Sequence, residues 1–170
     1  MKPPLLLKSV LDFCFICLVF IYSVTLISGI LMIFTDPEIP FEINGRAVEE
    51  LTPATIVFLI GSLLISGVFV YVVFLLRKLV RSFFKNEFFT RLQISLFNLI
   101  GQLIIISSVA ETLLDFLANL ILENELKVEL NFGNSYDSFF FKLAIGLFFI
   151  YLAKLFDNAR KLREESELTV

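Results

Sequence analysis

The chain has 170 residues, of which 58% are hydrophobic and 18% are charged, and its net charge at pH 7 is -3. A soluble domain of this size still exposes much of its surface, so it could not hide this much apolar area from water. There is no histidine, which removes the commonest general base and the commonest metal ligand. We therefore expect a protein that has the lipid bilayer as its solvent, that is not an enzyme, and that holds no metal and no cofactor.

Four long apolar stretches predict an all-α membrane protein with four transmembrane helices in a single domain, residues 1–170. The expected spans are residues 10–35, 54–76, 92–121 and 138–156. About 20 helical residues cross a hydrocarbon core of about 30 Å. The last stretch contains Lys142 and Lys154, whose long side chains can reach the interface. The first stretch is too long for the apolar part of a signal peptide, so we interpret it as a membrane helix.

Positive charge predicts the orientation, because lysine and arginine are retained on the cytoplasmic side of a membrane. Most of the 14 basic residues fall in the first segment, in the loop after the second span and in the C-terminal tail. Between the spans on the other side, the loops carry only Arg46 and Lys127 among several acidic residues, with Lys142 at the boundary. Both termini should therefore be cytoplasmic, and we expect a multi-pass protein of a bacterial inner membrane.

The two outer loops each contain an alternating pattern of apolar and polar residues, which is typical of a strand. In the first loop it covers residues 39–43 and is followed by the turn signal Asn44-Gly45. In the second loop it covers residues 126–132. The two segments could pair into a small two-strand extracytoplasmic cap. Thr52 and Pro53 then look like the N-cap and the first residue of the second helix.

The inner loop mixes aromatic and basic residues. Its members are Phe83, Phe84, Phe88 and Phe89 with Arg81, Lys85 and Arg91. Such a mixture suits the headgroup layer of a membrane, although a basic inner loop is also what the topology alone requires. We do not expect direct nucleic-acid binding by so short a loop.

The tail, residues 157–170, continues the helical pattern with several oppositely charged pairs four residues apart, each worth about 0.2–0.5 kcal/mol. An acidic segment is repelled by an anionic bilayer, so the end of this helix should stand away from the membrane and be available to a soluble partner. The candidate partner-binding residues are Leu162, Glu164, Glu165, Glu167, Leu168 and Val170.

The third span contains two further groups of polar residues. Ser95, Asn98 and Gln102 form one stripe, which we interpret as a helix-packing surface, with a substrate pathway as the alternative. Glu111 and Asp115 lie one turn apart near the outer interface. They either emerge into water on an exposed face or form an outer acidic site for a cation or a basic peptide.

Cys14 and Cys17 form a C-x-x-C pattern, the spacing found in soluble thiol-exchange proteins. Here it lies in an apolar span, where the surroundings keep a thiol inert. We interpret the two residues as packing or lipid-facing, with palmitoylation near the interface as the functional alternative.

Two segments resemble a known family. The first is Asn86-Glu87-Phe88-Phe89-Thr90, continuing through Leu96 to Ile100-Gly101, and the second is the acidic ending of residues 162–170. Both resemble DUF2975, a family of uncharacterised bacterial four-span membrane proteins. This chain departs from the family at Asn86 and around residues 158–159, where glycine is common. The resemblance implies no known reaction. Because members are often encoded beside a small helix-turn-helix regulator, it implies such a regulator as a partner at the cytoplasmic side.

These observations lead to two competing functions. The first is a non-enzymatic sensory or regulatory protein that binds a cytoplasmic regulator through the tail. The second is a small transporter or channel, formed as a homo-oligomer, that uses the polar stripe of the third span.

Overall fold

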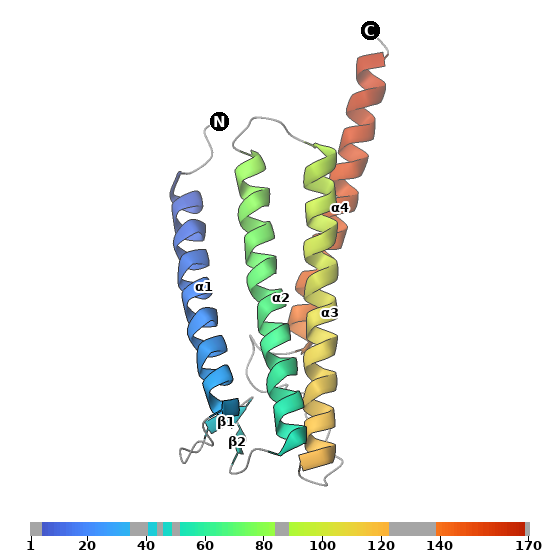
Figure 1. The fold of residues 1–170 in the computed structure, drawn as a ribbon. Coiled ribbons are helices and arrows are strands. Elements are labelled where there is room, and N and C mark those ends of the chain that lie inside the picture. The colour runs from blue at the N-terminus through green and yellow to red at the C-terminus, as the bar shows by residue number, and fades with distance from the viewer. Residues whose placement is uncertain are drawn as a thin grey trace.

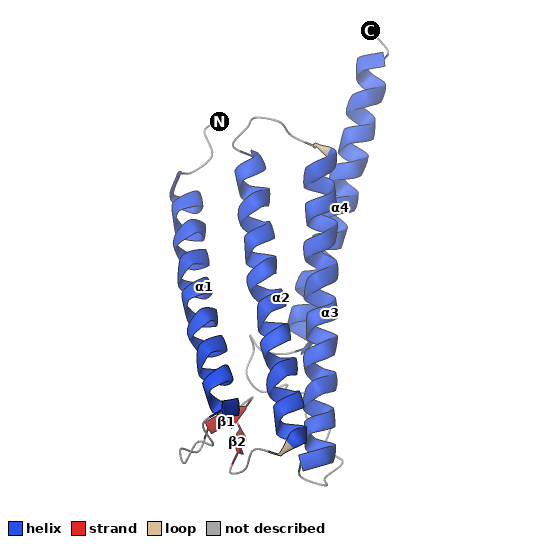
Figure 2. Ribbon diagram, viewed as in Figure 1, coloured by secondary structure: helices blue, strands red, loops and turns tan. Residues whose placement is uncertain are grey.

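The computed structural model describes residues 5–34, 41–43, 46–48, 52–83, 89–122 and 139–168. In chain order, the elements within these ranges are α1 (Leu5–Phe34), β1 (Phe41–Ile43), β2 (Arg46–Val48), α2 (Pro53–Phe83), α3 (Arg91–Leu122) and α4 (Phe139–Leu168) (Figures 1 and 2). The helices run up and down side by side. The start of α1 and the end of α4 lie together at what we call the terminal end, and β1 and β2 lie at the opposite, hairpin end.

All four helices are long and apolar enough to cross a membrane, which confirms the predicted four-helix membrane fold. Two helices, α2 and α4, end well beyond the predicted spans, because a helix can continue into charged sequence after its apolar stretch ends. On α2 the helix runs to Phe83, past the predicted limit at residue 76. The last helix is continuous from Phe139 to Leu168, so it includes the described part of the predicted helical tail. Length and apolar content were thus sufficient to find the helices, whereas their ends depend on local caps.

Two threonines cap the starts of α2 and α3. Thr52 accepts a hydrogen bond at its hydroxyl oxygen from the backbone N–H of Thr55, at 3.2 Å, so it is the predicted N-cap of α2. At α3, Thr90 and Gln93 form a reciprocal capping box. The Gln93 N–H donates to the Thr90 hydroxyl at 3.3 Å, and the Thr90 N–H donates to the Gln93 side-chain oxygen at 3.2 Å. These bonds fix where α3 starts.

The helices pack in chain order, α1 on α2, α2 on α3 and α3 on α4, and the last of these contacts is the most extensive. Gly101 of α3 and Gly146 of α4 face each other at the crossing. A Cβ atom built on Gly101 would lie 2.6 Å from the carbonyl oxygen of Gly146 and 2.7 Å from Cγ1 of Ile150. The close approach of the two backbones therefore requires glycine, as is common where membrane helices pack.

The core lies between α2, α3 and α4 towards the terminal end. It contains Ile100, which is fully buried, and the other members are Val72, Leu75, Leu79, Leu96, Phe97 and Ala153. Phenylalanine rings extend this core. The rings of Phe83, Phe89 and Phe97 lie around Phe156, with centroids 4.9–6.0 Å from it. Phe83 and Phe89 thus contact a ring of α4, and their place in the headgroup layer stays a prediction. Phe84 and Phe88 lie outside the described residues.

The short hairpin at the far end corrects the predicted cap. Strands β1 and β2 are antiparallel, with Phe41 opposite Val48 and Ile43 opposite Arg46. The first loop thus pairs with itself, because only two residues separate Ile43 from Arg46 in the sequence and the two strands are therefore close neighbours along the chain. Residues 126–132 lie outside the described residues. The predicted pairing between the two loops has no support, and the strand at 126–132 stays a prediction.

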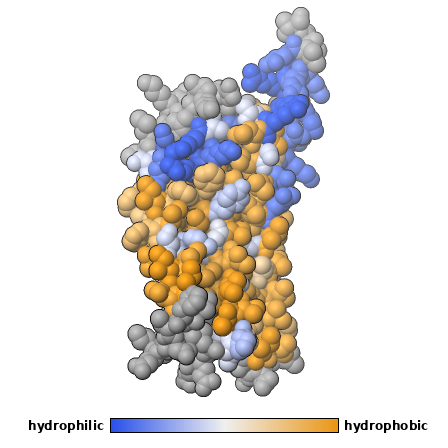
Figure 3. Space-filling model, viewed as in Figure 1, coloured by the Kyte–Doolittle hydropathy of each residue, from blue (hydrophilic) through white to orange (hydrophobic). Residues whose placement is uncertain are grey.

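Charged residues mark two levels along the bundle. Glu111 lies 20 residues after Arg91 on α3, which is about 30 Å along the helix, and Arg160 lies 18 residues after Lys142 on α4, which is about 27 Å. These distances match the thickness of a hydrocarbon core. Figure 3 shows the corresponding apolar belt, with hydrophilic residues gathered at the terminal end and along the end of α4. The part of the bundle between these two levels is therefore thick enough to span a hydrocarbon core.

Candidate functional site

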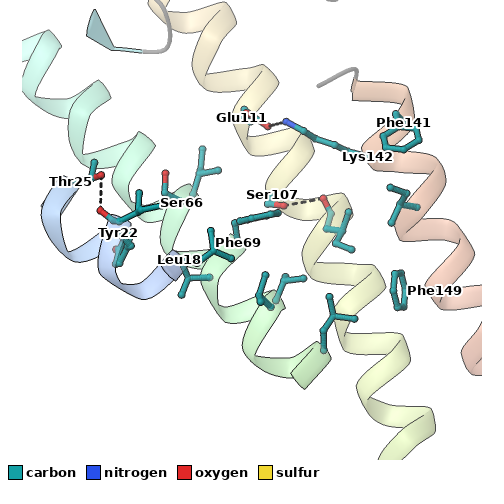
Figure 4. Close-up of a pocket in the computed structure, with 18 residues that line it drawn as sticks. Leu18, Tyr22, Thr25, Ser66, Phe69, Ser107, Glu111, Phe141, Lys142 and Phe149 are labelled. Atoms are coloured by element: carbon teal, nitrogen blue, oxygen red, sulfur yellow. Dashed lines mark hydrogen bonds and ion pairs between the residues drawn. The ribbon is translucent and has the colours of Figure 1, made fainter. Parts of the chain in front are cut away.

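A cavity of about 640 Å³ lies among all four helices, towards the hairpin end (Figure 4). Among the described elements α1 packs mainly on α2 and makes no extensive contact with α4, which leaves space between the first and last helices. The walls are mainly apolar, with Leu18 of α1, Phe69 of α2 and Phe149 of α4 among them. The cavity could therefore hold an apolar chain or an amphipathic molecule.

An ion pair between α3 and α4 lies at one side of this cavity. The Nζ atom of Lys142 donates to Oε2 of Glu111 at 2.7 Å, and both side chains are partly exposed. The candidate outer acidic site thus begins with a carboxylate that already faces an ammonium group, which weakens its attraction for a further cation. Asp115 lies one turn further along α3 and does not line the cavity. The pair joins α3 and α4 at the edge of the apolar belt nearer the hairpin end.

The hydroxyl groups around the cavity are used within the protein. Ser66, Thr25 and Ser107 each donate to a carbonyl oxygen one turn back on their own helix, at 2.8–3.0 Å. Tyr22 donates across helices to the carbonyl oxygen of Leu63 at 3.3 Å, and Gly67 leaves room for its ring. These bonds satisfy the polar groups in an apolar environment. Hydroxyls held in this way are not arranged as nucleophiles beside a base.

A second ion cluster joins α1 to α2 at the terminal end. The carboxylate of Asp12 accepts hydrogen bonds from Arg77 and, at 3.3 Å, from Arg81. The Arg77 guanidinium also lies over the ring of Phe15, 5.1 Å from the ring centroid. This cluster was not among the predicted sites. A single carboxylate at the edge of an apolar span was the available signal, because such groups pair with a cation.

The polar stripe of the third span points away from the bundle. Ser95, Asn98 and Gln102 are all exposed, and none of them lines the cavity among the four helices. They therefore do not pack in the interior of this four-helix bundle, and the interpretation as a helix-packing surface stays a prediction. The buried amide on α3 is Gln93, which is used in the cap of the helix. Ser95 and Asn98 instead line a groove of about 400 Å³ between α3 and α4 at the terminal end.

The end of α4 carries the predicted tail residues on an exposed helix that extends past the other three (Figure 1). Three of the expected charge pairs are present, Arg160 with Glu164, Lys161 with Asp157 and Arg163 with Glu167, at 2.7–2.9 Å. Leu162 has a relative exposure of 67%, and Glu164, Glu165 and Glu167 are exposed. Leu168 is the last helical residue, and Val170 lies outside the described residues.

The sequence matches the family described as Protein of unknown function (DUF2975) over residues 39–170. The chain belongs to this family. The match covers the hairpin, the three helices from α2 onwards and the tail, and it leaves α1 outside. Searches of curated proteins and of solved structures gave no match. This DUF2975 member is thus a multi-pass membrane protein of an uncharacterised family, and its activity has to be argued from its own residues.

Within the part of the chain that the structure describes, no three or more histidine, cysteine, aspartate or glutamate residues lie together as a metal-binding group. Cys14 and Cys17 are both free thiols, the first exposed on the apolar surface of α1 and the second half-buried. The structure therefore brings together three groups of candidate residues. These are the ion pair at the cavity, the basic groove containing Ser95 and Asn98, and the projecting tail.

Proposed function

We propose that this DUF2975 protein is a non-enzymatic sensory or regulatory membrane protein that binds a cytoplasmic partner through the end of α4. The observation that carries the proposal is the projecting helix itself. Residues 161–167 are exposed throughout, and Leu162 is a large apolar side chain among charged neighbours. A surface helix with one apolar contact point and surrounding charge is suited to a protein partner, with charge selecting the partner and its orientation.

The composition of the tail favours a basic partner surface. Glu164 and Glu167 are paired on the helix with Arg160 and Arg163, so their charge is partly compensated, while the whole segment ends in acidic sequence. A DNA-binding regulator of the helix-turn-helix class presents a basic surface, and the acidic residues would compete with DNA for it. In this proposal the membrane protein holds or releases the regulator, and the protein itself does not bind nucleic acid.

The proposed orientation of the protein in the membrane follows from the positive-inside rule. The terminal end carries the clustered cations Arg77, Lys78 and Arg81, so we propose that it faces the cytoplasm and that the membrane is the inner membrane of a bacterium. The absence of histidine, the paired state of Glu111 and the internally bonded hydroxyls around the cavity support the view that the protein is not an enzyme.

The test uses the full chain and a variant lacking residues 164–170. Both should insert into membranes to the same level, since the described side chains of the deleted segment, residues 164–167, are exposed. Only the full chain should retain the regulator in a membrane pull-down, and only the deletion should change transcription of the regulator's target genes. Charge reversal of Lys161 to Glu serves as a control for general charge effects on the same helix. If the deletion variant inserts and behaves like the full chain in both assays, the proposal is wrong.

A small transporter or channel is the second candidate. The observation that favours it is the exposed stripe of Ser95, Asn98 and Gln102, because a polar face on a membrane helix is stabilised by a second copy of the chain. A pathway along this stripe would need several copies to enclose it. The test is crosslinking in membranes. A defined oligomer that Gln102→Leu abolishes would favour the transporter or channel over the regulatory function.

A further inference from the structure

The groove between α3 and α4 at the terminal end combines positive charge with polar and apolar walls. Three basic residues line it, Arg91, Lys154 and Arg160, together with one acidic residue, Asp157. Its remaining lining residues are Ser95, Asn98, Ile94, Ile150 and Ala153. The groove has a volume of about 400 Å³.

The cations in this groove are not all compensated. Arg160 donates to Glu164 at 2.7 and 2.8 Å, and Asp157 accepts from Lys161 at 2.8 Å. Within the described ranges, Arg91 and Lys154 form no ion pair and no hydrogen bond through their side chains. Two exposed cations without an acidic partner therefore face one groove, which favours an anion there.

The depth of the groove in the membrane narrows the choice of anion. On α3, Asn98 lies seven residues further into the apolar belt than Arg91, which is about 10 Å along the helix. On α4, Lys154 lies six residues further into the belt than Arg160, which is about 9 Å. The groove thus reaches from the headgroup layer into the apolar belt. Exposed amide and ammonium groups at that depth are costly unless a polar partner enters with them. A molecule with an anionic head and apolar chains meets both requirements.

We propose that this groove binds the headgroup of an anionic phospholipid in the leaflet at the terminal end. Arg91 and Lys154 attract the phosphate, Ser95 and Asn98 offer hydrogen bonds to the ester region, and Ile94 and Ile150 contact the start of the acyl chains. Basic pockets between membrane helices are a recognised form of lipid-headgroup site. The proposal is independent of partner binding by the tail and concerns a different part of the molecule.

A second copy of the chain fits the groove less well than a lipid. A symmetric contact through this face would place the uncompensated cations of both copies against each other. Like charges that meet in a medium of low dielectric constant repel strongly. The anionic headgroup supplies the opposite charge that the groove lacks.

The experiment measures lipid binding to the purified full-length protein by native mass spectrometry. Phosphatidylglycerol is titrated against phosphatidylcholine with the same acyl chains. We expect preferential retention of phosphatidylglycerol, and we expect Arg91→Gln and Lys154→Gln each to weaken it about fivefold, the factor that corresponds to about 1 kcal/mol per basic residue. Asp157→Asn should strengthen binding, because it removes the one carboxylate from the groove.

The matched control is Lys78→Gln. Lys78 lies on α2 at the terminal end and does not line the groove, so its loss should change binding less than twofold. Asn98→Leu is a second groove variant that keeps every charge, and it should also weaken binding. If a charge variant does not yield folded protein, as judged by size-exclusion chromatography, Asn98→Leu replaces it in the test.

Four outcomes would overturn the proposal. Equal weakening by Lys78→Gln would show a general charge effect, and equal binding of the two lipids would show no headgroup recognition. Complete displacement of phosphatidylglycerol by millimolar inorganic phosphate would indicate a small-anion site. A dimer that Asn98→Leu dissociates, with lipid binding unchanged, would make this face a protein interface. Because the assay contains no cytoplasmic partner, its result is separate from that of the tail experiment.

Discussion

The crossing of α3 and α4 at Gly101 provides a sharp test of the packing. Replacing Gly101 by alanine adds one methyl group, whose carbon would lie 2.6 Å from the Gly146 carbonyl oxygen and 3.0 Å from the backbone nitrogen of Ile150. Ordinary contacts of this kind need 3.4 Å or more. The obstacles are backbone atoms, so the side chains alone cannot relieve the clash and the two helices must move apart.

The expected loss of stability follows from two opposing effects. Overpacking of a well-packed contact costs about 1–3 kcal/mol. Alanine is a better helix former than glycine by about 1 kcal/mol, which offsets part of this. We expect Gly101→Ala to lower the free energy of unfolding by up to about 2 kcal/mol, and Gly101→Ile to have a larger effect.

Gly61→Ala is the matched control, because it makes the same chemical change inside another membrane helix. A Cβ atom at Gly61 would meet Cδ1 of Leu114, the far end of a flexible side chain that can rotate away. Gly61→Ala should therefore be neutral or slightly stabilising. Reversible unfolding of the purified protein in detergent micelles, followed by circular dichroism, compares the two variants. Equal stability of Gly101→Ala and Gly61→Ala would refute the close backbone approach.

Three further predictions address other contacts. Asp12→Asn should loosen α1 from α2 and lower the midpoint of thermal unfolding in micelles, whereas Asp157→Asn on the tail should leave this midpoint unchanged. Equal midpoints for the two variants would show that the Asp12 cluster does not hold α1 on α2. Glu111→Gln and Lys142→Met should each lower the unfolding midpoint, because each removes one member of the ion pair at the edge of the apolar belt, and unchanged midpoints of both variants in micelles would argue against the pair. Val128→Asp should reduce the yield of folded protein while Lys127→Asp should not, and equal tolerance of both would remove the predicted strand at 126–132.

The sequence was sufficient for the four helices because each apolar stretch is long enough to span, and this property depends on local composition alone. It was also sufficient for the N-cap at Thr52, since the cap and the N–H group that donates to it are three residues apart. The capping box of Thr90 and Gln93 has an equally local signature and was available from the same reasoning.

The contacts that define the candidate sites depend on tertiary structure and were not predicted. Asp12 and Arg77 are 65 positions apart, and Glu111 and Lys142 are 31 apart. Which helix face meets which neighbour decides these pairs, and the pattern of one sequence does not fix it. The polar stripe shows the same limit. Its spacing indicates one face of α3 but does not say whether that face meets the bundle or the surroundings, and the structure places it outside.

The central claim is that the terminal end, with the projecting end of α4, faces the cytoplasm. The most direct test fuses a reporter that is active only in the cytoplasm after Val170 or inserts it at Gly45, in otherwise identical proteins. We expect activity for the fusion after Val170 and none for the insertion at Gly45. Activity at both positions, or at Gly45 alone, would contradict the arrangement and the tail-binding function with it.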